Sequence, residues 1–186
     1  MKKTKFNSRT LAIIGLMSAV TFVVTKFISI PIPVAIGGKT RIHLGNSICV
    51  LSGLLFGGLP GGLAAGIGSA LVDLTDPRWA PEFYITFINK FAMGFIAGAI
   101  AHMGKRSLGK DIVAATAGAF TYVALYLLKS YIGQVILGSA PEAIKGVLMT
   151  KAATSATNAV MAIVISVVLF KVIEPALKKA RLFQDN

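Results

Sequence analysis

Residues 42–74 read IHLGNSICVLSGLLFGGLPGGLAAGIGSALVDL, and this stretch decides how many helices the chain contains. It is apolar almost throughout, with Asp73 as its one acidic or basic residue apart from His43. A single helix of this length would extend about 50 Å, well beyond a bilayer core of about 30 Å. The run FGGLPGG at 56–62 cannot continue a helix cleanly, because glycine and proline favour turns. We therefore expect two short helices in a hairpin, in preference to one long kinked helix.

Four further stretches each supply roughly 20 mostly apolar residues, which is the length of a helix that crosses a bilayer. The chain of 186 residues is 55% hydrophobic and only 14% charged, more apolar surface than a soluble fold of this size can hide. The sequence predicts an all-α integral membrane protein with about six transmembrane helices in one bundle, forming a single domain over 1–186. The expected helices are 9–30, 42–57, 60–75, 82–104, 111–137 and 146–175.

The first of these stretches has an alternative interpretation as a cleaved signal peptide. Lys2, Lys3, Lys5 and Arg9 precede its apolar run, as basic residues do in signal sequences. Its length and the missing A-x-A cleavage pattern favour a helix that is retained.

The basic residues indicate which side of the membrane each end occupies. The net charge is +12, but the lysines and arginines flank apolar spans and form no continuous stripe with interleaved aromatics, so nucleic acid is not an expected partner. With a cytoplasmic N-terminus, eleven of the 19 basic residues lie on the inner side and five on the outer side. The positive-inside rule therefore predicts that both termini are cytoplasmic.

With this topology, most strongly polar residues within the spans fall in the outer half of the bundle. Polar side chains from five helices at one depth favour a cavity for a small polar ligand, since lone polar groups in lipid are costly. Amide side chains can read the edge of a heterocycle, and aromatic rings can stack on it. The candidate ligand-binding residues are His43, Asn46, Asp73, Trp79, Tyr84, Asn89, Lys90, Tyr126, Lys129, Lys151 and Asn158.

The lysines in or near the spans also have a plain structural interpretation. A charge near the bilayer centre costs at least about 2.5 to 3.5 kcal/mol, but Lys26, Lys129 and Lys151 can snorkel to the interface. Lys90 lies about eight residues inside its span, where an ion pair with Asp73 would neutralise it. Both alternatives remain open from the sequence.

The uncharged candidates have structural alternatives too. Asn46 and Asn158 could be interhelical hydrogen-bond partners, each worth roughly 0.6 to 2 kcal/mol. Trp79 and Tyr131 also suit an interfacial aromatic belt. The loop 31–38 is apolar, with prolines that stiffen it and glycines that permit a hinge, so we expect a lid over the cavity, with an ordinary connector as the alternative.

Small residues on the first span predict a surface for another helix. Gly15 and Ala19 lie four residues apart, with Ala12 nearby, so a second backbone can approach closely. Similar patterns at 62–70 and 94–98 more often serve internal packing. For the first span we expect an external protein partner.

No motif of catalysis is present in the sequence. It has no Walker A pattern, no H-E-x-x-H, no G-x-S-x-G and only one cysteine, Cys49, so we expect no enzyme, no cofactor and no metal site. Energy for uphill transport must come from another protein. A secondary transporter or channel with Asp73, Lys90 and Glu82 as its ion path is the main alternative, although the inner stretches 95–100 and 161–170 are almost purely apolar.

Three motifs, RIHLGN at 41–46, LLFG at 54–57 and GIGSALVDL at 66–74, resemble the substrate-binding S components of energy-coupling factor (ECF) vitamin importers. The motif-bearing part spans roughly 41–98, and the later helices match in hydropathy and length only. The resemblance implies a prokaryotic plasma-membrane subunit that binds a B-vitamin or precursor from outside. It also implies docking on a transmembrane coupling subunit driven by two ATPase subunits, with release inward by toppling.

Two further expectations come from the same resemblance. Members of this family carry an Ala-x-x-x-Ala motif on the first helix for docking, and Gly15 to Ala19 matches it with glycine in place of the first alanine. The chain looks most similar to the subgroup for hydroxymethylpyrimidine or pyridoxine-like compounds, which are small polar heterocycles.

Overall fold

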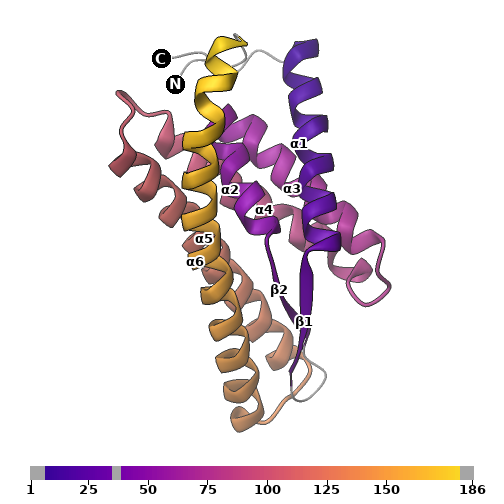
Figure 1. Ribbon diagram of the computed structural model, residues 1–186. Coiled ribbons are helices and arrows are strands. Elements are labelled where there is room, and N and C mark those ends of the chain that lie inside the picture. Colours follow the sequence, from indigo (N-terminus) through magenta and orange to yellow (C-terminus); the bar gives the residue numbers. More distant parts are fainter. Residues whose placement is uncertain (1–6, 35–38, 181–186) are drawn as a thin grey trace.

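Six α-helices and one two-stranded hairpin make up the computed structural model, which describes residues 7–34 and 39–180 (Figure 1). The elements in chain order are α1 (Ser8–Phe27), β1 (Ser29–Pro33), β2 (Lys39–His43), α2 (Gly45–Phe56), α3 (Gly58–Leu74), the 3₁₀ turn η1 (Ala80–Glu82), α4 (Phe83–Ala101), α5 (Leu108–Ile136) and α6 (Pro141–Lys179).

Among the described residues, four helices are long and apolar enough to cross a membrane, namely α1, η1 with α4, α5 and α6. The other two are shorter: α2 has 12 residues and α3 has 17, so they extend about 18 and 26 Å. The chain breaks between them at Gly57, whose φ of 86° lies in the region that favours glycine. The long stretch 42–74 is therefore a helical hairpin whose first helix is too short to span a bilayer.

The β-hairpin corrects two expected helix ends, because residues 29–30 and 42–43 belong to strands. β1 and β2 pair antiparallel, with Ile30 opposite Ile42 and Pro31 opposite Arg41. Proline lacks an N–H to donate and fits an edge strand better than a helix interior. The prolines at 31 and 33, which lie in the segment expected to form a lid, thus favour the strand over a continuation of α1.

Glycines allow α2, α3 and α4 to pack with their backbones close together. A Cβ atom at Gly98 would lie 2.3 Å from the carbonyl carbon of Gly57, and one at Gly53 would lie 2.3 Å from the Gly94 carbonyl oxygen. On α3, a Cβ at Gly62 would approach Phe91 in the same way. The small-residue patterns on α3 and α4 therefore serve internal packing.

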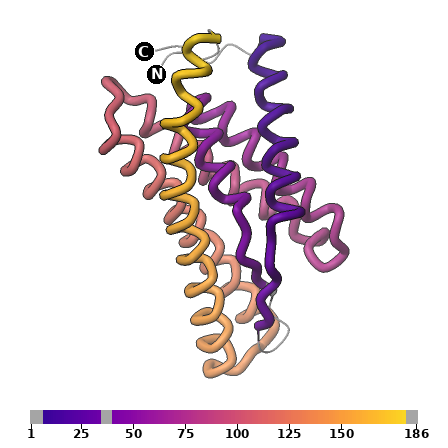
Figure 2. The backbone as a smooth tube through the Cα atoms, viewed as in Figure 1, coloured from indigo at the N-terminus to yellow at the C-terminus, as the bar shows by residue number. Residues whose placement is uncertain are grey.

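Helix α1 begins and α6 ends at the same end of the bundle, and the β-hairpin lies toward the opposite end, beside the first part of α6 (Figures 1 and 2). We call the end with the start of α1 the inner end, following the orientation predicted from the basic residues, and the end with the hairpin the outer end. The outer parts of α5 and α6 extend past the ends of α2, α3 and α4 (Figure 2).

Candidate substrate-binding cavity

A partly enclosed cavity lies between β2 and the outer parts of the bundle. Its wall has seventeen residues, which come from α1, β2, α3, the loop before η1, η1 itself, α4, α5 and α6. Its volume is about 50 Å³, whereas pockets for drug-sized ligands measure about 300 to 1,000 Å³. In this conformation the cavity has room only for a small molecule.

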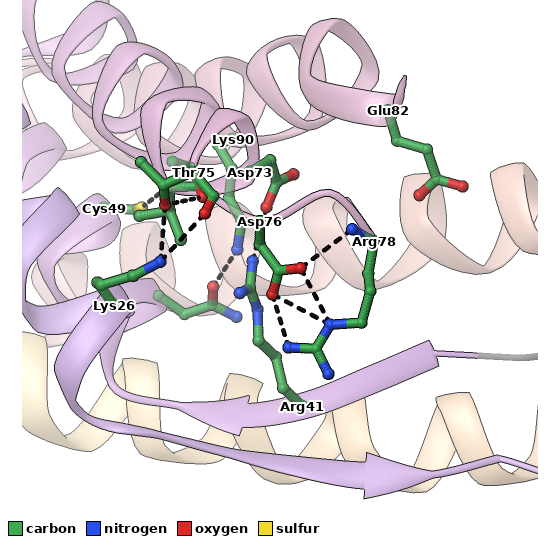
Figure 3. Close-up of polar contacts among 12 residues, drawn as sticks. Lys26, Arg41, Cys49, Asp73, Thr75, Asp76, Arg78, Glu82 and Lys90 are labelled. Atoms are coloured by element: carbon green, nitrogen blue, oxygen red, sulfur yellow. Dashed lines mark hydrogen bonds and ion pairs between the residues drawn. The ribbon is translucent and has the colours of Figure 1, made fainter. Parts of the chain in front are cut away.

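Arg41 on β2 fastens the hairpin to the mouth of the cavity. Its guanidinium donates to the Asp73 carboxylate at the end of α3 with an N–O distance of 2.7 Å (Figure 3). The same guanidinium lies 4.8 Å from the ring centroid of Trp79, which permits a cation–π contact. Asp73 is almost fully buried, so this ion pair neutralises a carboxylate that would otherwise be costly.

Asn158 on α6 holds the same strand through its backbone. Its Nδ2 donates to the Arg41 carbonyl oxygen at 2.8 Å, and its Oδ1 accepts from the His43 amide at 3.0 Å. The side chain thus pairs with the strand as a neighbouring strand would. The Asn158 amide thus links a helix to the hairpin. The sequence had left open a structural role for Asn158, but as a hydrogen-bond partner between two helices.

Lys90 on α4 projects into the cavity with only 3% of its surface exposed. Its ammonium group donates to Oδ1 of Asn46 on α2 (Figure 3) and lies 3.6 Å from the ring centroid of Tyr122. Asp73 instead bonds Arg41, so the ion pair between Asp73 and Lys90, which the sequence left open as an alternative, is not formed. A neutral amide and an aromatic face contact Lys90 in place of a carboxylate.

The α5 wall carries two tyrosines and a lysine on one face. Tyr122 and Tyr126 stack with their centroids 5.8 Å apart, and Lys129 forms an ion pair with Glu82 of η1. The spacing of four and then three residues puts all three side chains on the same side of a helix.

Eight of the eleven candidate residues line the cavity. Asn46 and Lys151 are buried next to it: Asn46 accepts from Lys90, and Lys151 donates to Ser130 Oγ at 3.1 Å. Tyr84 is 55% exposed and packs edge-on against Phe83, away from the cavity. The lining candidates are His43, Asp73, Trp79, Asn89, Lys90, Tyr126, Lys129 and Asn158.

The sequence interpretation missed two important wall residues. The sequence placed Arg41 in the motif RIHLGN without assigning it to the ligand site, and Tyr122, which lies deep in its span, was not among the candidates. The spacing of Tyr122, Tyr126 and Lys129 was the signal that could have identified the α5 face. For Arg41 the motif RIHLGN indicated the family but not that the side chain lines the cavity, because that position depends on the hairpin.

The mouth loop also holds a second, exposed ion pair outside the spans. Arg78 Nη2 lies 2.7 Å from Asp76 Oδ2, and the arginine side chain is 67% exposed. Hydrogen bonds from Arg78 lower the pKa of Asp76 to about 2. Neither residue lines the cavity.

The small-residue surface of α1 faces away from the bundle. Ala12, Gly15 and Ala19 are exposed, and a Cβ atom at Gly15 would meet nothing within 4 Å. Leu16 beside them is 64% exposed. By contrast, a Cβ at Gly68 of α3 would lie 2.5 Å from the Ser18 carbonyl oxygen on the opposite side of α1.

Titratable groups in the described ranges do not cluster as metal sites do: no group of three or more His, Cys, Asp or Glu residues there could hold a metal ion. Cys49 is a free, buried thiol that lies 3.6 Å from Ser69 Oγ. The chemistry that this wall offers is therefore hydrogen bonding, ion pairing and stacking.

Comparison with known proteins gives relatives and solved structures of the same fold, among which are the following two relatives and one structure. A Pyrococcus woesei chain named "Uncharacterized protein in gap 3'region" is 34% identical over 111 residues, 59% of this chain and 70% of its own length. A UPF0397 protein of Lactiplantibacillus plantarum is 36% identical over 83 residues, 42% of this chain and 43% of its own. The S component of a bacterial ECF transporter superimposes with a TM-score of 0.70 at 16% identity, over 91% of this chain and 98% of that one.

The family model described as "ECF-type riboflavin transporter, S component" matches residues 5–175, which is nearly the whole chain. The fold, the apolar spans and this match agree with one another. The chain therefore belongs to the S-component family of ECF-type transporters, as a multi-pass membrane protein that serves as the substrate-binding subunit of a vitamin transporter and is not an enzyme.

Proposed function

We propose that this S component captures a single-ring, water-soluble vitamin or vitamin precursor, of the hydroxymethylpyrimidine or pyridoxine type, on the extracellular side. The observation that carries the proposal is the small polar cavity under β2, where Lys90 and Asn89 lie beside the rings of Tyr122 and Tyr126. Amides and an ammonium group suit the ring nitrogens and hydroxyl groups of such a compound, and the tyrosines can stack on its face.

The size of the cavity favours a ligand with one ring over a ligand with three rings. Riboflavin, which appears in the family's description, is a three-ring compound with a polyhydroxylated chain. A volume of about 50 Å³ is several times too small for such a ligand. A single heterocycle requires far less rearrangement of the hairpin and the mouth loop.

The hairpin is a suitable lid. It contributes Thr40, Arg41 and His43 to the cavity wall, and it is fastened by side chains of α3 and α6. We therefore assign to the hairpin the role that the sequence suggested for 31–38, of which residues 35–38 lie outside the described part of the chain. Opening would break the Arg41 ion pair and the two Asn158 hydrogen bonds.

Copurification tests the proposal. The chain purified alone in detergent should retain a small molecule that mass spectrometry identifies as a single-ring vitamin or precursor. Calorimetry with that compound should then give tight, saturable binding without any gradient or partner. Retention of riboflavin would contradict the proposed substrate class, and absence of any bound compound together with no binding of vitamins would contradict the proposed function.

For assembly, we propose that Ala12, Gly15 and Ala19 form the surface that docks on the transmembrane coupling subunit, which two ATPases drive. Gly15→Leu should block ATP-dependent uptake and leave ligand affinity unchanged, because it fills an open helix surface. Gly133→Leu is the matched control, since a Cβ at Gly133 on α5 also meets nothing within 4 Å. Equal loss of uptake in both variants, or loss of ligand binding in Gly15→Leu, would contradict the assignment.

A further inference from the structure

The charges on the cavity wall do not cancel. Its charged residues, histidine aside, are three cations, Arg41, Lys90 and Lys129, and two carboxylates, Asp73 and Glu82. Arg41 bonds Asp73, and Lys129 bonds Glu82. In the part of the chain that the structure describes, no carboxylate oxygen lies within 4.0 Å of Lys90 Nζ. One positive charge therefore remains without an anion.

The two groups that contact Lys90 reduce the cost of its burial without neutralising its charge. The Asn46 amide supplies a carbonyl dipole, and the Tyr122 ring supplies a cation–π contact. A buried ammonium without an anion costs several kcal/mol relative to water. A negatively charged group in the cavity would offset that cost, so the site favours an anion.

Unpaired polar groups lie close to this cation. Asn46 and His43 are both more than nine-tenths buried. Within the structure described, Nδ2 of Asn46 and Nδ1 of His43 have no hydrogen-bond partner. Buried polar atoms without partners are uncommon in native structures and mark places where a missing group completes the bonding. The Asn46 amide orients its carbonyl toward Lys90, so its N–H donors are left for another acceptor.

We propose that the ligand binds with an anionic oxygen, either an ionised ring hydroxyl or a phosphate ester, paired with Lys90 on α4. This inference rests on the proposed function and deepens it, because it selects the charged forms within the single-ring class. A pyridoxine-like ring satisfies it through its ionised hydroxyl. An aminopyrimidine satisfies it only as its phosphate ester.

Matched neutral and anionic probes test the inference on the intact chain. Trp79 is the only tryptophan and lies on the cavity wall, so its fluorescence reports occupancy. The first pair is pyridoxine and 3-O-methylpyridoxine, whose ring oxygen cannot ionise. The second pair is 4-amino-5-hydroxymethyl-2-methylpyrimidine and its phosphate ester. We expect the anionic member of at least one pair to bind at least about tenfold more tightly, and which pair shows the preference identifies the source of the charge.

Substitution of the lysine shows whether that preference comes from Lys90. Lys90→Met should abolish the preference between the paired probes, and Lys90→Arg should retain it. Lys26→Met is the control, because Lys26 bonds Thr75 outside the cavity. Thermal unfolding of each variant identifies any that fail to fold, in which case Lys90→Arg and Lys90→Gln provide the comparison.

The outcomes are distinct from those of the proposed function. Equal or weaker binding of the anionic members in both pairs, or a preference that survives Lys90→Met, overturns this inference while a vitamin-binding subunit still stands. If neither pair of probes binds, the charge of the compound that copurifies with the chain tests the inference, and an uncharged compound overturns the inference. A chain that retains no small molecule contradicts the proposed function itself.

Discussion

The outer and inner ends of the bundle both bury charged residues, but they use them in opposite ways. At the outer end, the charged side chains of β2, α3, α4 and α5 surround a cavity, and Lys90 points into it. At the inner end, the buried carboxylate of Asp111 at the start of α5 forms ion pairs with Arg106 at 2.8 Å and with Lys171 at 3.3 Å.

In this inner cluster of Arg106, Asp111 and Lys171, Arg106 makes two further contacts. It also donates to the Leu54 carbonyl oxygen at the end of α2, and its guanidinium lies 3.9 Å from the ring centroid of Phe170. One arginine thereby links α2, α5 and α6. From this comparison we infer that buried charge indicates a candidate ligand site where the charged groups line a cavity and one of them has no group of opposite charge.

The largest effect should come from breaking the inner cluster. Asp111→Ala removes a fully buried carboxylate and should lower the free energy of unfolding by about 3 to 5 kcal/mol. The midpoint temperature of thermal unfolding in detergent should fall by about 6 °C or more. Asp76→Ala, which removes a partly exposed carboxylate, is the control, and equal midpoints for the two variants would contradict the proposed difference.

At the outer end, Arg41→Ala should weaken ligand binding by about thirtyfold or more, the equivalent of about 2 kcal/mol. The substitution leaves Asp73 buried without its partner and frees the hairpin from α3. Calorimetry measures the change, and Arg78→Ala serves as the matched variant because that arginine is exposed at the same mouth. Similar ligand affinities in the two variants would contradict the proposed role of Arg41 in holding the hairpin over the ligand.

A smaller effect is expected from Asn158→Ala, which removes two hydrogen bonds to the β2 backbone. At about 0.5 to 1.5 kcal/mol for each bond, ligand dissociation should accelerate by about tenfold. Stopped-flow fluorescence of Trp79 gives the rate. An unchanged dissociation rate would mean that the hairpin does not need this link.

The smallest effect concerns the exposed pair in the mouth loop. Asp76→Asn should leave ligand affinity unchanged and shift the unfolding midpoint by no more than about 2 °C. Because the folded-state pKa is lowered to about 2, the carboxylate's small contribution to stability is complete above about pH 4. It is lost as the pH falls through about 2. A stability change centred near neutral pH on substitution of Asp76 would contradict this assignment.

The sequence predicted the helices well because apolar length and glycine–proline breaks are local signals. It located the break in the stretch 42–74, and it identified the outer polar layer that includes Asn89 and Lys90. It failed at the hairpin, since strand pairing between 29–33 and 39–43 depends on contacts that no local period reveals.

Partner choice within the cavity was equally hidden from the sequence. Asp73 ends α3, Arg41 lies on β2 and Lys90 lies on α4, and the position of β2 decides which of the two cations Asp73 bonds. Tyr84 and Tyr126 are the same residue type on neighbouring helices, yet one is exposed and the other lines the cavity. Side-chain direction, which depends on the packing of the whole bundle, separates them.

Cysteine protection tests the central claim most directly. Thr86 lines the cavity and Lys145 is exposed on the outer part of α6, while Cys49 is fully buried. We expect the retained ligand to slow reaction of Thr86→Cys with a membrane-impermeant thiol reagent, added from outside, by at least about tenfold. The rate at Lys145→Cys should not change. Labelling of Thr86→Cys only from the cytoplasmic side, or at a rate that ligand does not alter, would contradict an outward-facing ligand cavity.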